Sequence, residues 1–133
     1  MRSISLLLLV AACTSETPAT PDRMISVSCD TGIAEFCATD PCDQTLEAAK
    51  QDTSLCEPGF PPTLTRCGDF DIVSKSEIDS GASYYYQGGQ LVAIIGRVAP
   101  SLTRCSAGPP TFSAPRCDAT ASESLPACAP NAR

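Results

Sequence analysis

The sequence predicts a small, disulfide-rich α+β domain with a short antiparallel sheet of two or three strands and one short helix. Three observations lead to this fold class. The chain holds nine cysteines in 133 residues. A glycine pair separates two apolar runs in its second half, and one stretch in its first half carries the signals of a helix start. A chain of this length suits one domain, which we place at residues 24–133.

The helix is predicted near residues 41–52. Asp40 can serve as its N-cap, and Pro41 suits the first helical position, where a backbone N–H has no partner in any case. The acidic residues Asp43 and Glu47 follow, as is usual near a helix start.

The strands are predicted from three apolar runs, Phe70–Val73, Ala82–Gln87 and Gln90–Val98. Gly88 and Gly89 separate the last two runs, and glycine readily accepts the positive φ angles of a type I′ turn. The sequence therefore predicts a β-hairpin with a two-residue loop.

This hairpin has a predicted register. It pairs Tyr86 with Leu91, Tyr85 with Val92 and Tyr84 with Ala93. Because side chains alternate along a strand, one face is expected to carry Tyr84, Tyr86, Leu91, Ala93 and Ile95, and the other Tyr85, Val92 and Ile94. Both faces are apolar, so both need cover.

Two segments are predicted to lack regular structure. Residues 57–62 contain three prolines, which remove backbone donors and fix the chain. The tail from Ser106 to Arg133 is rich in proline, alanine and serine, and we expect Cys117 and Cys128 to tie it to the domain.

The N-terminus has the pattern of an export signal. Arg2 is followed by an apolar run from Ile4 to Ala12 that ends in small residues. A helix needs about 20 apolar residues to cross a membrane. This run is shorter, so residues 1–12 are predicted to target the chain rather than to span a bilayer.

Val10-Ala11-Ala12-Cys13 resembles the lipobox of bacterial lipoprotein precursors, in which cleavage falls before an invariant cysteine. The resemblance implies lipid on Cys13 and attachment to a membrane, with residues 14–23 as a flexible tether. Thr14, in place of aspartate after the cysteine, favours the outer membrane over the inner one, with the domain on the periplasmic or surface side. The alternative is ordinary signal cleavage after Ala12 and simple secretion.

The number of cysteines favours lipidation. Once Cys13 is acylated, eight remain, an even set that can pair completely in an oxidising compartment. The predicted disulfide cysteines are Cys29, Cys37, Cys42, Cys56, Cys67, Cys105, Cys117 and Cys128. Spacing does not choose among their pairings. Cys67–Cys105 is not the automatic pair, because the two residues begin and end a three-stranded meander and so lie at opposite ends of it.

Composition argues against several functions. The net charge of −6 disfavours nucleic-acid partners. The chain has no histidine, which removes catalysis and zinc sites that need one, and we predict no metal and no cofactor. Asp30-Thr31-Gly32 and Asp79-Ser80-Gly81 resemble the catalytic triplets of aspartic proteases but read better as turns. Ser74-Lys75-Ser76 reads as a solvated loop or strand end rather than a catalytic dyad.

The sequence thus favours a non-enzymatic binding or structural module of the bacterial cell envelope. Tyr84, Tyr85 and Tyr86 are a candidate recognition patch, since tyrosine offers large contact area at low entropy cost. The alternative is simple packing, which is the more frequent role of aromatic residues in strands. The alternative function is a disulfide-stabilised protease inhibitor that uses the loop at residues 57–66. The segment from Tyr84 to Ala93 and its cysteine setting resemble uncharacterised cysteine-rich lipoproteins of myxobacteria-like Gram-negative bacteria, which implies a location and no activity.

Overall fold

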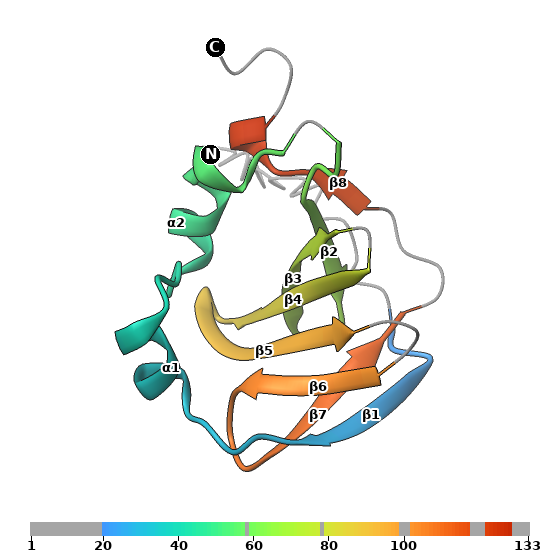
Figure 1. Ribbon diagram of the computed structural model, residues 1–133. Helices are drawn as coiled ribbons and strands as arrows, with labels where there is room; N and C mark the ends of the chain where they lie inside the picture. The colour runs from blue at the N-terminus through green and yellow to red at the C-terminus, as the bar shows by residue number, and fades with distance from the viewer. Residues whose placement is uncertain (1–19, 58, 78, 99–101, 118–121, 129–133) are drawn as a thin grey trace, which may run out of the picture.

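A computed structural model of the chain describes residues 20–57, 59–77, 79–98, 102–117 and 122–128. Its strands form two antiparallel sheets, one of six strands and one of two (Figure 1). In chain order the elements are β1 (Arg23–Ser28), α1 (Ile33–Thr39), α2 (Leu46–Gln51), the 3-10 helix η1 (Thr53–Leu55), β2 (Thr63–Cys67), β3 (Phe70–Ser76), β4 (Ser80–Gln87), β5 (Gln90–Val98), β6 (Leu102–Ala107), β7 (Thr111–Arg116), β8 (Ser122–Ser124) and the 3-10 helix η2 (Pro126–Cys128). The signal segment and Cys13 lie outside the described residues, and within these no helix is long and apolar enough to cross a membrane.

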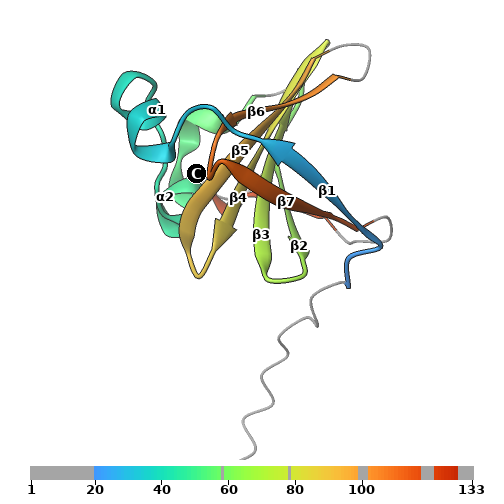
Figure 2. The ribbon, with the colours of Figure 1, turned by 90° about the horizontal axis from the view of Figure 1, so that it is seen from below.

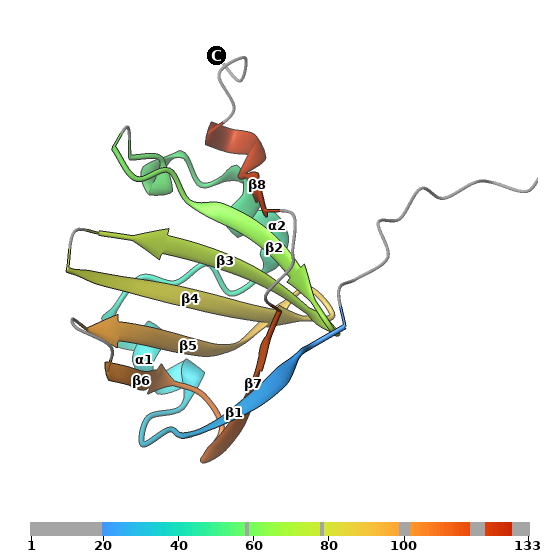
Figure 3. The same cartoon turned by 90° about the vertical axis from the view of Figure 1, so that its right-hand side faces the viewer.

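The elements form three layers. The large sheet has the strand order β6-β5-β4-β3-β2-β8, and the small sheet pairs β1 with β7. The β1–β7 pair covers one face of the large sheet, and the helices cover the other (Figures 2 and 3). Both faces of the large sheet are therefore covered, as its apolar pattern requires.

The predicted fold class is wrong. The protein is mainly β, with eight described strands in two antiparallel sheets, and not a two- or three-stranded α+β domain. The extra strands come from short segments with weak patterns. For example, β7 contains Pro115, which a strand tolerates here because β1 is the one partner of β7 among the described strands, so β7 lies at an edge of its sheet.

The helix prediction is correct in part. Helix α2 begins at Leu46, and its N-cap is Thr45, whose hydroxyl accepts a hydrogen bond from the N–H of Ala48 at 3.2 Å. Asp40 has the opposite role, because it ends α1, and its N–H donates to the carbonyl of Phe36. Sequence reasoning missed α1 and placed the start of the following helix too early.

The Gly88-Gly89 hairpin is confirmed, with φ angles of +58° and +80° at the two glycines. Tyr86 pairs with Leu91 as predicted, but a β-bulge follows, so Tyr85 faces Ala93 and Tyr84 faces Ile94. The bulge adds one residue to β5, which turns the residues beyond it to the other face. The predicted face sets are therefore wrong beyond Val92.

Two hydrophobic cores result, one on each side of the large sheet. The first lies under the β1–β7 pair and contains Cys29, Cys67, Ile72, Tyr85, Ala93, Ile95, Phe112 and Ala114. The second lies under the helices and contains Leu46, Ala49, Val73, Tyr86, Leu91, Ile94, Ala107 and Leu125.

Four disulfides use all eight of the predicted cysteines. Two of them, Cys29–Cys105 and Cys67–Cys117, join the β1–β7 pair to the large sheet. Cys56–Cys128 links the segment after η1 to η2, and Cys37–Cys42 closes a short loop between α1 and α2. Cys67 and Cys105 take different partners, as the strand geometry indicated.

Candidate functional site

The three tyrosines of the predicted patch do not share one surface. Tyr85 is 5% exposed and belongs to the core under the β1–β7 pair. Tyr84 and Tyr86 point to the helix side, where Tyr86 is 1% exposed and Tyr84 packs at the edge of the core. Alternation along β4 separates them, so the patch reduces to Tyr84 and the surroundings of Tyr86.

Tyr85 has a packing role. Its ring makes edge-to-face contacts with Phe70 and Phe112, at centroid distances of 5.9 and 5.2 Å. Phe70 and Phe112 also meet edge to face, at 5.7 Å. Such clusters favour this geometry because the positive edge of one ring meets the negative face of another.

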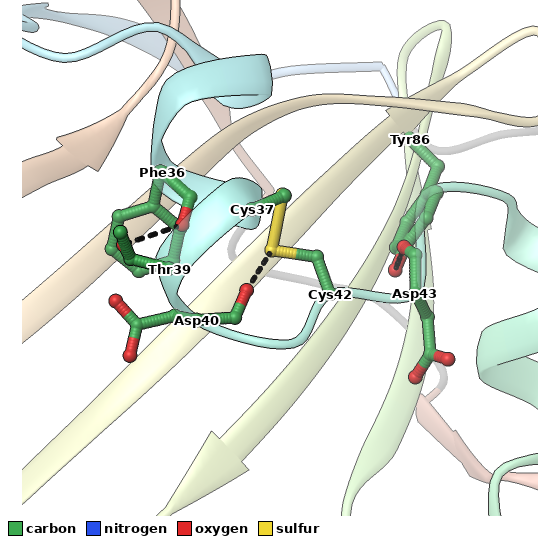
Figure 4. Close-up of a disulfide and its surroundings, with 7 residues drawn as sticks. All are labelled: Phe36, Cys37, Thr39, Asp40, Cys42, Asp43 and Tyr86. Atoms are coloured by element: carbon green, nitrogen blue, oxygen red, sulfur yellow. Dashed lines mark hydrogen bonds between the residues drawn. A yellow bond between two sulfur atoms is a disulfide. The ribbon is translucent and has the colours of Figure 1, made fainter.

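Tyr86 fixes the segment between the two helices. Its hydroxyl donates a hydrogen bond to the backbone carbonyl of Asp43 at 2.7 Å (Figure 4). The same segment runs along the Gly88-Gly89 turn, where the N–H of Leu46 donates to Gly89 and that of Leu91 donates to Gln44, both at 2.9 Å. Asp43 is therefore held beside the sheet.

The Cys37–Cys42 disulfide holds the start of this segment against the end of α1 (Figure 4). The Sγ of Cys42 lies 3.3 Å from the carbonyl oxygen of Asp40, a close contact and not a hydrogen bond, because a bridged sulfur carries no proton. The bridge thus helps to place Asp43.

A cavity of about 190 Å³ lies between this segment, η1 and the sheet. We name it the Tyr84 cavity. Its walls combine two carboxylates, two phenols and an apolar side, and the lining residues are Pro41, Cys42, Asp43, Asp52, Ser54, Leu55, Val73, Tyr84 and Tyr86.

The pKa values of the two carboxyl groups of the cavity are shifted in opposite directions. Burial and the hydrogen bond to Asp52 raise the pKa of Asp43 from its ordinary value of 3.8 to about 6. Hydrogen bonds from Asp43 and from Ser54 lower the pKa of Asp52. Below about pH 6, Asp43 therefore carries the proton of the pair and Asp52 is the charged acceptor, and above that pH both carboxyl groups are ionised.

The tyrosine hydroxyls of the cavity stay protonated. Burial, followed by the charges of Asp43 and Asp40, raises the pKa of Tyr84. Burial, followed by the charge of Asp43, raises that of Tyr86. Tyr86 already donates to a carbonyl, so Tyr84 supplies the phenol proton that a ligand can use.

The cavity has the chemistry of a binding site. Asp52 also caps η1, where the N–H of Ser54 donates to its carboxylate at 2.9 Å, so Ser54 makes a local turn contact. No group of three or more potential metal ligands occurs in the part of the chain that the structure describes. The triplets at Asp30 and Asp79 do not line the cavity: Gly32 caps α1, and Ser80 and Gly81 open β4.

The proposed inhibitory loop, residues 57–66, is loop only in its first part. Thr63–Cys67 forms β2, whose two edges pair with β3 and β8. Pro62 is buried, and Phe60 is 42% exposed. Thr63, Leu64 and Thr65 are paired on both sides of β2, so their backbone groups are not available to a protease.

The comparisons with known proteins give no relative to guide the interpretation: no family model, no curated protein and no solved structure matches this chain.

Proposed function

We propose that this protein is a non-enzymatic binding module of the bacterial cell envelope, anchored by lipid on Cys13 and exposed on the periplasmic or outer side of the membrane. The outer membrane is the preferred location. The Tyr84 cavity is the proposed binding face, and its carboxyl pair and phenol suit a small neutral or basic ligand with several hydrogen-bonding groups.

The observation that carries the proposal is the complete pairing of the eight cysteines. Within the described residues each of them bonds to another of the set, so none is left to pair with Cys13. Disulfides of this number persist in oxidising compartments. Lipid on Cys13 would account for the ninth cysteine, and simple secretion would leave it free or intermolecular.

Binding is preferred to catalysis because of the groups in the cavity. The acceptor Asp52 is occupied by Asp43 and by Ser54, and the phenol of Tyr86 is occupied by a backbone carbonyl. Activating a nucleophile needs a base directed at it. Ser54 is the serine of the cavity wall, and its hydroxyl does donate to Asp52, but the pKa of this carboxyl is lowered and the group caps η1, so it is a poor base for activating a nucleophile.

Intact-mass analysis of protein extracted from its native membrane tests the anchor. We expect a mass that includes the lipid, cleavage before Cys13, and on reduction a gain of eight hydrogen atoms for the four bridges. Cys13→Ser should abolish the lipid, and Ser15→Ala is the matched control that should keep it. A lipid-free wild type, or free thiols before reduction, would contradict the proposal.

A protease panel tests the alternative function. Extracellular and periplasmic proteases are titrated with the wild-type protein and with Phe60→Ala, which alters the exposed part of the loop at residues 57–62. We expect no inhibition by either protein at micromolar concentration. Saturable inhibition that the substitution weakens would favour the inhibitor instead.

A further inference from the structure

The sheet face under the β1–β7 pair becomes polar toward one end. Ile72 and Tyr85 lie in the core, and Ser74 and Ser83, each two residues away from one of them, follow on the same face. These two serines are cross-strand partners, and their hydroxyl oxygens lie 3.2 Å apart. One hydroxyl donates its proton to the other, so one O–H of the pair remains to donate to a ligand.

Two arginines from different layers lie at this polar end of the sheet face. Arg97 lies two residues beyond Ile95 on β5, and Arg116 lies two residues beyond Ala114 on β7. Both line one cavity of about 190 Å³, together with the serine pair and Thr103. We name it the arginine cleft. It lies on the opposite face of the large sheet from the Tyr84 cavity.

Two observations place the arginine side chains within the cleft. A Cβ atom built on Gly81 would lie 3.7 Å from Nη2 of Arg97, so this guanidinium rests beside a position that has no side chain. Arg116 and Tyr85 line the cleft together, where burial raises the pKa of the Tyr85 hydroxyl and the charge of Arg116 opposes that rise.

The charge of the cleft is opposite to that of the whole protein. The chain has 15 acidic and nine basic residues, yet no residue that lines the cleft is acidic. Two ion pairs occur in the part of the chain that the structure describes, Lys50–Glu47 and Arg66–Asp71, and neither involves Arg97 or Arg116. Lys75 also contributes to the lining, but it lies two residues after Val73 and takes the other face, where Glu77 lines a cavity with it. The charge inside the cleft thus comes from the two arginines.

We infer that the arginine cleft binds a phosphate or sulfate group, presented as a free ion or as the ester end of a small ligand. Guanidinium groups bind such oxyanions through paired N–H donors, and approach from two layers lets both arginines contact one group. The hydroxyls of the serine pair and Thr103 add neutral donors.

The size and the charge of the protein limit the ligand. A cavity of about 190 Å³ accepts a single anionic group rather than an extended polymer. The net charge of −6 repels a long polyanion outside the cleft. This inference extends the proposed binding role, but its test does not depend on the anchor, because binding is measured with the protein in detergent whether or not Cys13 carries lipid.

Calorimetric titration of the full mature protein at low ionic strength tests the inference. The probes are sodium phosphate, sodium sulfate and methyl phosphate, with sodium acetate and sodium chloride as comparison salts. We expect saturable binding of the first three and at least tenfold weaker binding of acetate and chloride. Tighter binding of methyl phosphate than of phosphate would identify an ester as the ligand, and the reverse order would identify the free ion.

The variants Arg97→Gln and Arg116→Gln should each weaken phosphate binding about tenfold or more, because each removes charged hydrogen bonds. Arg66→Gln makes the same charge change outside the cleft and should change binding less than twofold. Binding that is equal in all three variants, or no saturable binding to the wild type, would overturn the inference.

Arginine modification gives a second readout that needs no variant. Phosphate should protect Arg97 and Arg116 of the wild-type protein from phenylglyoxal, as mapped by peptide mass, and should leave Arg66 unprotected. Equal modification rates of the three arginines with and without phosphate would also overturn the inference.

Discussion

At the scale of single residues, strand alternation decides what neighbouring side chains do. Tyr84, Tyr85 and Tyr86 follow one another in β4, yet Tyr85 packs against two phenylalanines while Tyr86 holds the segment that carries Asp43. Tyr84 lines a cavity. A run of identical residues in a strand that is covered on both faces therefore indicates two environments rather than one patch.

The first prediction concerns the proton of Asp43, whose pKa is raised to about 6 in the folded protein from 3.8. A raised folded-state pKa contributes stability that is complete below the ordinary pKa and is lost as pH rises through the folded value. Asp43→Asn supplies an amide N–H donor to Asp52 in place of the carboxyl proton. Because the amide does not titrate, the variant does not lose this stability as pH rises. We expect the melting temperature of the variant, relative to the wild type, to increase between about pH 4 and pH 7.

Thermal unfolding followed by circular dichroism across that range measures the effect. The lowered pKa of Asp52 acts in the opposite sense, since its contribution is present at higher pH and is lost as pH falls. Asp40→Asn makes the same charge change on an exposed residue nearby and is the control. If both variants show the same pH dependence relative to the wild type, Asp43 does not hold the proton.

At the scale of elements, the sequence predicted those parts that local chemistry determines. The strands at residues 70–73, 82–87 and 90–98 are all present, within β3, β4 and β5, because apolar runs and a glycine pair specify a hairpin directly. The bulge at Val92 escaped prediction because no residue type requires it. Its effect is large, since it moves Ala93 and Ile95 to the core with Tyr85.

A second hairpin had a signal that sequence reasoning did not use. Cys67 pairs with Phe70 across Gly68-Asp69, and Gly68 has a φ of +58°. Glycine followed by aspartate between two strands is a known two-residue hairpin pattern. By contrast, β8 has three exposed residues and no apolar alternation. Its position is set by the residues after it, because Leu125 is fully buried and Cys128 is bridged to Cys56.

The glycine turn supports a prediction at this scale. Gly88 has a φ of +58° and no atom within 4 Å of a Cβ built on it, so Gly88→Ala introduces no collision and tests the backbone alone. Alanine disfavours this conformation, and we expect a loss of about 1 kcal/mol in the free energy of unfolding. Urea unfolding measures it.

Gly59→Ala is the matched control for Gly88→Ala, because Gly59 is equally open and has no positive φ. This control should be neutral or slightly stabilising, since alanine restricts the unfolded chain. Equal losses at the two positions would show that the left-handed backbone of the turn is not required.

At the scale of the whole molecule, the features that the sequence did not predict arise from pairing between segments that are far apart in the chain. Strand β1 pairs with β7, and β2 pairs with β8, although the partners are far apart in the sequence. No sequence pattern near either strand indicates its partner. The candidate site depends on the same kind of information. Tyr84 could be named from its pattern, but Asp43 and Asp52 meet only because α1, α2 and η1 fold over the sheet. Arg97 and Arg116 come together only because the two sheets stack.

The disulfides fasten this long-range arrangement. Cys29 follows the end of β1 that pairs with the start of β7, and Cys117 follows the end of β7 that pairs with the start of β1. The two bridges therefore hold the β1–β7 pair to the large sheet at both of its ends. The arginine cleft lies between these layers, so its geometry depends on the bridges.

The last prediction compares a long-range bridge with a local one. Cys29–Cys105 spans 76 residues and Cys37–Cys42 spans 5. In the chain-entropy model, closing these loops contributes about 4 and about 2 kcal/mol, respectively. Replacing both cysteines of a pair by alanine should therefore reduce the free energy of unfolding more for Cys29–Cys105 than for Cys37–Cys42. The difference is at most about 2 kcal/mol, because Cys67–Cys117 already shortens the path between Cys29 and Cys105. Guanidinium unfolding measures the free energy of unfolding of both variants.

Hydrogen exchange should also show faster exchange in β1 and β7 for the variant that lacks Cys29–Cys105, and not for the variant that lacks Cys37–Cys42. Equal losses, or exchange spread evenly over the large sheet, would mean that packing of Phe112 and Ala114, and not the bridge, holds the two layers together.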